Sequence, residues 1–139
     1  MNSELPAVSV CTRCRPQGWP DTANRERPGA VLASALQQSL SDAVLPPPIN
    51  LRRVRCMSQC LRPCVIAFSH RDRFTYLFGD LDPARHVGDI LVAVRMWLSG
   101  SDGFMGRGKR PRSMRSGILG RIPPLDCTHE TIESQTPFS

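Results

Sequence analysis

The sequence predicts a single α/β domain built on a small mixed sheet, and three observations support this prediction. Two segments with apolar residues at helical spacing alternate with short runs of β-branched and aromatic residues. The chain has 139 residues, which suits one hydrophobic core with an appendage. Its composition, 40% hydrophobic and 22% charged, is typical of a folded globular protein rather than a disordered one.

The first half of the chain predicts a strand, a helix and a second strand. A short β-prone run covers residues 7–10 and is followed by a loop over 15–28 that is rich in proline and glycine. Apolar residues at helical spacing predict a helix over 29–45, which the three prolines at 46–48 end. Residues 50–55 alternate in polarity and predict the second strand.

The second half predicts a β-hairpin and a final helix. The apolar run 65–68 and the aromatic run 74–78 flank a turn at Arg71 and Asp72. We expect the last helix to have Asp82 as its N-cap, Pro83 at its first position and Gly100 just past its end. A helical connection of about 30 residues suits a parallel crossover between the first two strands. The β-α-β-β-α order is therefore that of a small thioredoxin-like fold.

The C-terminal part is expected to lie outside this fold. We place the domain at residues 6–99 and a basic arm, rich in glycine and proline and partly disordered at its end, at 100–139. The formal net charge is +6, and a segment without acids between Gly103 and Leu125 carries six positive charges: Arg107, Lys109, Arg110, Arg112, Arg115 and Arg121. This segment lacks interleaved aromatic residues, so we expect no sequence-specific nucleic-acid binding. An acidic protein partner and contact with its own domain both remain open.

The sequence shows no signal for export or membrane insertion. Residues 1–7 lack a basic n-region and an apolar h-region, and no stretch approaches the roughly 20 apolar residues that span a bilayer. We therefore expect a cytoplasmic protein without membrane contact. In that compartment six cysteines indicate metal or redox chemistry rather than disulfides.

Five of the cysteines form two groups that follow the first two strands. Cys11 and Cys14 form a CxxC pair, while Cys56, Cys60 and Cys64 form a CxxxCxxxC run. If the strands are neighbours, both groups emerge at the same end of the sheet. Thiolates select zinc, iron–sulfur clusters or Cu(I).

Three interpretations of these cysteines differ in chemistry. A thiol oxidoreductase is disfavoured, because a nucleophilic cysteine usually lies at a helix N-terminus and the residues after Cys14 include Pro16, Gly18 and Pro20. A four-cysteine zinc site is compatible with the ligands, although this chain has enough core to fold without metal. A [2Fe–2S] cluster is also compatible, although neither the bacterial nor the plant-type ferredoxin spacing is present.

A family resemblance favours the cluster. The second cysteine group and the strand after it resemble the thioredoxin-like [2Fe–2S] ferredoxins. Several strings resemble more closely the bacterial DUF1636 family of predicted metal-binding proteins: CTRCR (11–15), CLRPC (60–64), TYLFGDLDP (75–83) and RIPPL (121–125). The resemblance runs from about residue 8 to 125 and implies a thioredoxin-like fold and a metal-binding role.

Five cysteines compete for four ligand positions. We expect Cys11, Cys14, Cys56 and Cys60 to hold the cluster, with Cys64 as a substitute ligand or a buried small hydrophobe. Cys127 is expected to be an unpaired thiol. The predicted function is a non-enzymatic cluster-bearing protein for electron transfer or an accessory redox role; the alternative is a non-redox protein that binds zinc or another soft metal.

Arginines surround the predicted ligands in the sequence. Six of them lie within a few residues of a ligand: Arg13, Arg15, Arg52, Arg53, Arg55 and Arg62. Positive charge there stabilises an added electron, or it forms a docking face for an acidic redox partner. A solvated surface is the alternative for any single arginine, and a homodimer is compatible with the sequence.

Overall fold

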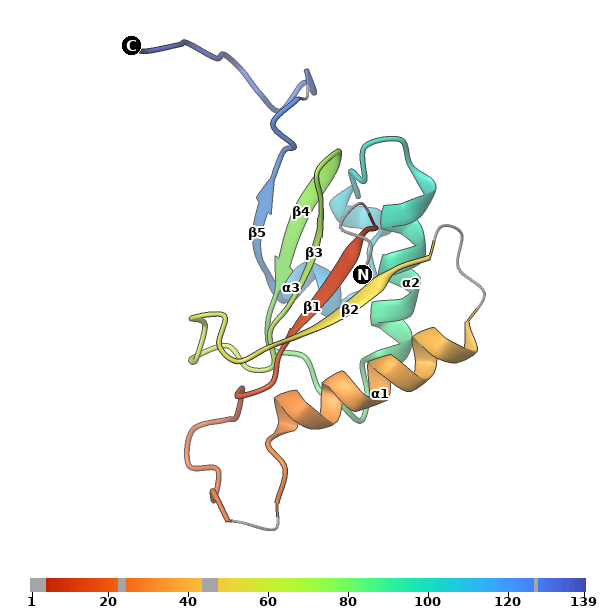
Figure 1. Cartoon of the computed structure of the whole chain (residues 1–139), viewed down its shortest axis with the longest axis vertical. Coiled ribbons are helices and arrows are strands. Elements are labelled where there is room, and N and C mark those ends of the chain that lie inside the picture. Colours follow the sequence, from red (N-terminus) through yellow and green to blue (C-terminus); the bar gives the residue numbers. More distant parts are fainter. Residues whose placement is uncertain (1–4, 23–24, 44–47, 127) are drawn as a thin grey trace.

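A computed structural model of the chain describes residues 5–22, 25–43, 48–126 and 128–139. It contains a five-stranded sheet, three α-helices and one 3-10 turn in the described residues (Figure 1). In chain order the elements are β1 (Ala7–Cys11), α1 (Pro28–Asp42), β2 (Asn50–Val54), β3 (Ile66–His70), β4 (Arg73–Phe78), α2 (Val87–Ser99), η1 (Arg107–Lys109), α3 (Ser113–Ser116) and β5 (Ile118–Ile122).

The sheet has the strand order β2-β1-β3-β4-β5. β1 and β2 are parallel, with Ala7 opposite Asn50 and Cys11 opposite Val54. The other pairs are antiparallel. The helix-containing crossover from β1 to β2 and the β3–β4 hairpin confirm the predicted α/β arrangement, with one further strand.

The core lies between the sheet and the helices α1 and α2, which pack on the same side of the sheet (Figure 1). Alternate residues of β4, namely Phe74, Tyr76 and Phe78, are fully buried, as the two-residue period of a strand requires. The ring of Trp97 on α2 lies 5.5 Å from that of Phe68 on β3. Aromatic packing of this kind anchors α2 to the sheet.

Both helices differ in extent from the prediction. α1 begins at Pro28 and ends at Asp42, so the expected stop at the prolines falls mostly outside the described residues. α2 begins at Val87, not at Pro83, so the prediction that Asp82 caps this helix is wrong. The Asp82 carboxylate accepts the Ala84 N–H at 2.7 Å, and the His86 ring accepts the Asp82 N–H at 2.9 Å. These bonds close a separate turn before the helix.

The predicted arm is not confirmed over its first part. β5 pairs with β4, with Thr75 opposite Ile122. Met105 and Met114 are buried, and the Tyr76 hydroxyl accepts the Met105 N–H at 2.7 Å. The two methionines are isolated and β5 is short, so this segment has no periodic apolar pattern. Periodicity in the sequence therefore does not reveal that the segment packs on the domain. The His129 ring still packs on the domain, with its centre 4.9 Å from that of Phe74 and 4.6 Å from that of Phe104. Beyond it the last residues lead away from the sheet (Figure 1).

No helix in the described part of the chain combines the length and the apolar character needed to cross a bilayer.

Candidate metal centre

The parallel pairing of β1 and β2 brings both cysteine loops to one end of the sheet. The Cys11 N–H donates to the Val65 carbonyl at 3.0 Å, and the Thr12 N–H donates to the Val54 carbonyl at 2.8 Å. The backbone is therefore fixed on both sides where the first loop begins. This confirms the expectation that the two groups emerge together.

The first turn of α1 closes over the first loop. The Gly29 N–H donates to the Cys14 carbonyl at 3.0 Å. A Cβ atom at Gly29 would lie 2.1 Å from the Cys11 carbonyl oxygen and 3.1 Å from the Cys14 Cβ. Only glycine allows the helix to approach Cys11 and Cys14 this closely.

The second loop is shaped by its own backbone and by Gly79. The Ser58 N–H donates to the Cys56 sulfur at 3.4 Å, and Ser58 has a left-handed φ of 60°. A Cβ at Gly79 would lie 2.6 Å from the Arg62 carbonyl, and Arg62 pairs with Asp80 at 2.6 Å. The strand end and the loop are thereby held against each other.

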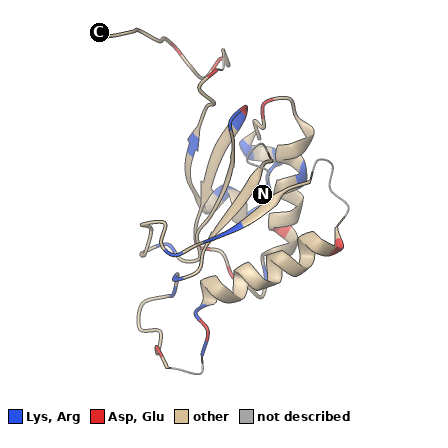
Figure 2. Cartoon of the chain, viewed as in Figure 1, with Lys and Arg blue, Asp and Glu red and all other residues tan. Residues whose placement is uncertain are grey.

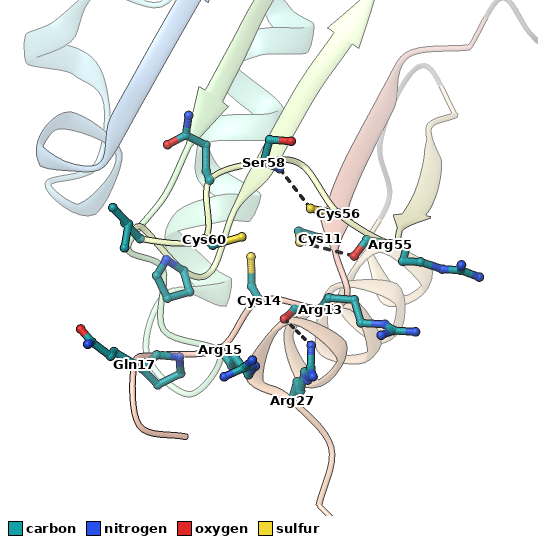
Figure 3. A pocket seen from close by; sticks show the side chains of 14 residues that line it. Cys11, Arg13, Cys14, Arg15, Gln17, Arg27, Arg55, Cys56, Ser58 and Cys60 are labelled. Carbon is teal, nitrogen blue, oxygen red and sulfur yellow. Dashed lines mark hydrogen bonds between the residues drawn. The ribbon is translucent and has the colours of Figure 1, made fainter. Parts of the chain in front are cut away.

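The two loops enclose a cavity of about 630 Å³. Cys11, Cys14, Cys56 and Cys60 all line it, and Figure 3 shows their sulfur atoms facing the same space from the two loops. Cys11 and Cys14 are buried, whereas Cys56 and Cys60 are exposed. The four thiols thus form an inner pair and an outer pair.

Cys64 occupies a different environment from the other four. It is only 2% exposed, is not among the residues that line this cavity, and exchanges backbone hydrogen bonds with Leu81 at 3.1 and 3.3 Å. Burial raises the pKa of its thiol to about 12. This position matches the expected buried small hydrophobe. Cys127 lies outside the described residues.

The Cys14 thiol holds its proton strongly when the site holds no cation. Burial raises the pKa of Cys14 to about 12, and hydrogen bonding and charge interaction with the Cys11 sulfur add to the effect. The Cys11 thiol in turn donates to the Arg55 carbonyl at 3.9 Å. A soft cation binding here must displace protons.

The donor set agrees in its chemistry with a dinuclear cluster. Within the described residues, no three His, Cys, Asp or Glu side chains lie close enough together to hold a single metal ion. A four-cysteine zinc site needs every sulfur at about 2.3 Å from one ion. A [2Fe–2S] cluster instead distributes four cysteines over two irons. Four cysteine thiols around one cavity are donors of the type that both groups use.

Arginines, and no carboxylates, line the same cavity. The four arginines are Arg13, Arg15, Arg27 and Arg55. Asp21 accepts a bond from Arg27 at 2.6 Å and lies 3.4 Å from Arg15, and the bond from Arg27 lowers the pKa of Asp21. Arg27 also donates to the Arg13 carbonyl at 3.2 Å. Asp21 thus fixes two of the positive charges near the cysteines.

Sequence proximity identified only some of these arginines. Arg52 bonds to Ser9 at 2.9 Å and Arg53 to Ser34 at 3.1 Å, and neither lines the cavity. Arg27 was missed because a loop separates it from Cys14. The sequence feature that could have identified Arg27 is its position just before the predicted helix.

A family model described as "Protein of unknown function (DUF1636)" matches residues 8–124. The chain belongs to this family. The match covers both cysteine loops of the DUF1636 chain and the β5 strand. No curated protein matches it in a sequence comparison.

Solved structures show where this DUF1636 fold belongs. A thioredoxin-like [2Fe–2S] ferredoxin from Aquifex aeolicus aligns with a TM-score of 0.54 and 19% identity, covering 89% of this chain and 98% of the ferredoxin. Two cysteine-to-serine variants of that ferredoxin give TM-scores of 0.52 at 18% and 17% identity, each covering 84% of this chain and 99% of the variant. At these identities the similarity establishes the thioredoxin-like ferredoxin fold of the DUF1636 chain.

Proposed function

We propose that this DUF1636 protein holds a [2Fe–2S] cluster on Cys11, Cys14, Cys56 and Cys60 and serves as an electron carrier or accessory redox protein rather than an enzyme. The observation that carries the proposal is that two loops from neighbouring parallel strands place four cysteines around one cavity. The likeness in fold to a [2Fe–2S] ferredoxin supports it. The bound cluster would supply one-electron redox chemistry.

The protein contributes burial on one side of the centre and access on the other. Cys11 and Cys14 lie under the first turn of α1, so this side of the site excludes water. Cys56 and Cys60 face solvent, where a redox partner can approach closely. Cysteine ligands bind as thiolates, and the four guanidinium groups of the cavity stabilise that negative charge.

The rim of the cavity suits an acidic partner. Arg13 and Arg55 have no ion-pair partner in the described part of the chain. Leu61 lines the same cavity and is 90% exposed, so it offers an apolar contact. Positive charge around an exposed apolar residue favours docking of a protein with an acidic patch. Such docking would weaken as salt concentration rises.

Anaerobic purification tests the cluster directly. We expect a brown protein with about two irons and two sulfides per chain, bleached by dithionite. Cys60→Ser should remove the colour, because Cys60 lines the cavity. Cys64→Ala is the matched control and should keep it, because Cys64 lies in the core.

Two results would contradict the proposal in different ways. A colourless protein with one zinc per chain would support the non-redox soft-metal alternative. Loss of colour in Cys64→Ala, with colour kept in Cys60→Ser, would overturn the assignment of the ligands.

A further inference from the structure

A second group of arginines lies on the segment from η1 to β5, and none of them lines the cavity between the cysteine loops. Arg110, directly after η1, is only 4% exposed, and its guanidinium lies 5.8 Å from the ring centre of Tyr76. Its Nε and Nη1 atoms are buried and have no hydrogen-bond partner among the residues that the structure describes. A buried cation without a partner is unusual, because burying an unpaired charge is costly.

The neighbours of Arg110 are also positively charged. Burial lowers the pKa of Arg110, and repulsion from Arg121, Arg107 and Arg115 lowers it further. The Nε atom of Arg115 is buried without a partner as well. Figure 2 shows basic residues on both α3 and β5.

No carboxylate in the described residues neutralises this group. Asp89 of α2 contacts the same segment, but its carboxylate accepts a hydrogen bond from the Ser113 hydroxyl at 2.8 Å. The face of the Tyr76 ring offers Arg110 a cation–π contact, which offsets only part of the cost of burial. Asp89 thus brings one negative charge near the segment, but none of the four arginines forms an ion pair within the described chain.

A cavity adjoins these arginines. It has a volume of about 490 Å³ and is lined by Arg107, Gly108, Arg112, Arg115 and Ser116. Guanidinium groups bind phosphate through paired N–H···O bonds, and three of them line this space. A single carboxylate would neutralise only one of several positive charges, whereas a phosphoryl group carries nearly two negative charges.

We propose that this cavity binds the phosphoryl group of a phosphorylated small molecule, through Arg107, Arg112 and Arg115, with buried Arg110 adding positive charge beside them. The anion supplies the missing counter-charge. The site is independent of the cysteine centre and does not depend on any metal.

Titration calorimetry with inorganic phosphate and with pyrophosphate tests the proposal, with acetate at matched ionic strength as reference. We expect saturable binding of the phosphates and none of acetate. Arg115→Gln should weaken binding about tenfold or more, as the loss of a charge-assisted hydrogen bond predicts. Arg53→Gln removes the same charge from β2, at the opposite edge of the sheet, and should leave binding unchanged.

Arg110→Met gives a second test, because it should raise thermal stability without phosphate and abolish the stabilisation by pyrophosphate. In phosphate-free buffer this variant should be more thermally stable than the wild type, because an apolar side chain replaces a buried unpaired charge. It should also lose the rise in melting temperature that pyrophosphate gives the wild type. A merely structural Arg110 would leave that rise intact, which would remove Arg110 from the site.

Three outcomes would overturn the proposal. One is the absence of saturable phosphate and pyrophosphate binding. Another is equal weakening in Arg53→Gln and Arg115→Gln, which would indicate an effect of net charge alone. The third is binding of a short single-stranded oligonucleotide by a protein that does not bind pyrophosphate. This result would point to a nucleic-acid backbone as the ligand.

Discussion

Cys64 shows how the fold separates residues that look equivalent in the sequence. Cys56, Cys60 and Cys64 repeat at a constant spacing. The first two lie on an exposed loop, whereas the chain at Cys64 is already paired to Leu81 through the backbone. The spacing could not reveal this difference, because it arises from a partner 17 residues away in the sequence.

Replacement of Cys64 predicts a pH-dependent change in stability of the metal-free protein. Cys64→Ala should lower the free energy of unfolding at pH 7 by about 1–2 kcal/mol, as expected for a small buried side chain. The folded-state pKa of Cys64 is raised from 9.0 to about 12. Between these values the unfolded chain ionises and the folded one does not, so the thiol's contribution is complete below pH 9 and falls as pH rises towards 12.

Urea unfolding of the wild type and Cys64→Ala from pH 7 to 11 measures this effect. The difference between the two proteins should narrow above pH 9. A difference that stays constant or widens would contradict the assigned burial of the thiol.

At the level of elements, α1 changes the argument about the CxxC pair. Proline and glycine after Cys14 exclude a helix that starts there, which disfavours a thiol oxidoreductase. The structure nevertheless brings the first turn of α1 back onto the pair through Gly29. The stronger argument is burial, because the pKa of Cys14 is raised to about 12 and a nucleophilic thiol needs a lowered one.

Two glycine substitutions test the role of this contact. Gly29→Ala should destabilise the protein by about 1–3 kcal/mol, because the new methyl group would overlap the Cys11 carbonyl. It should also reduce the metal content, since the helix must move away from Cys11 and Cys14. Gly88→Ala on α2 is the control: nothing lies within 4 Å of its added Cβ, so alanine should stabilise the helix by up to about 1 kcal/mol.

Thermal unfolding and metal analysis of both variants provide the measurement. Equal behaviour of the two variants would show that the close approach at Gly29 is not required.

The elements that could be predicted are those with a periodic pattern or strong turn signals. The β3–β4 hairpin follows from local sequence, and α1 begins at Pro28, one residue before the predicted start. The start of α2 was misplaced because Asp82 and Pro83 are equally suited to a turn. β5 was missed because its pairing with β4 depends on distant residues and its own sequence contains a glycine and an arginine.

For the candidate site, sequence reasoning identified the cysteines but not all of their surroundings. Residue type and spacing indicated five clustered cysteines for four positions; the expected ligands Cys11, Cys14, Cys56 and Cys60 all line one cavity, whereas Cys64 does not. The position of Arg27 depends on how the loop over residues 15–27 folds, which local patterns do not determine.

At the level of the whole molecule, the segment after α2 completes the domain. Met105, Met114 and β5 together cover the β4 side of the core. A chain ending at Gly100 would leave Tyr76 without its bonds to Met105 and β4 without its outer neighbour. An exposed apolar edge strand promotes aggregation.

Two truncations test this integration. The chain ending at Gly100 should fail to fold cooperatively and should aggregate. The chain ending at Glu133 retains His129 against Phe74 and Phe104 and should keep the melting temperature of the full protein to within a few degrees. Circular dichroism during heating and limited proteolysis distinguish the two. Cooperative folding of the shorter chain would restore the predicted domain boundary at residue 99.

The interior position of β1, between β2 and β3, has a consequence for biosynthesis. β1 is the first of the five strands to leave the ribosome, but its neighbours β2 and β3 come more than 35 residues later in the sequence. All four cavity cysteines lie within the first 60 residues, so they are synthesised before β3, β4 and α2 can cover β1. During translation the inner thiols Cys11 and Cys14 are therefore as accessible as the outer ones. Until the fold is complete, all four cysteines of the nascent chain are therefore accessible to metal delivery or to oxidation.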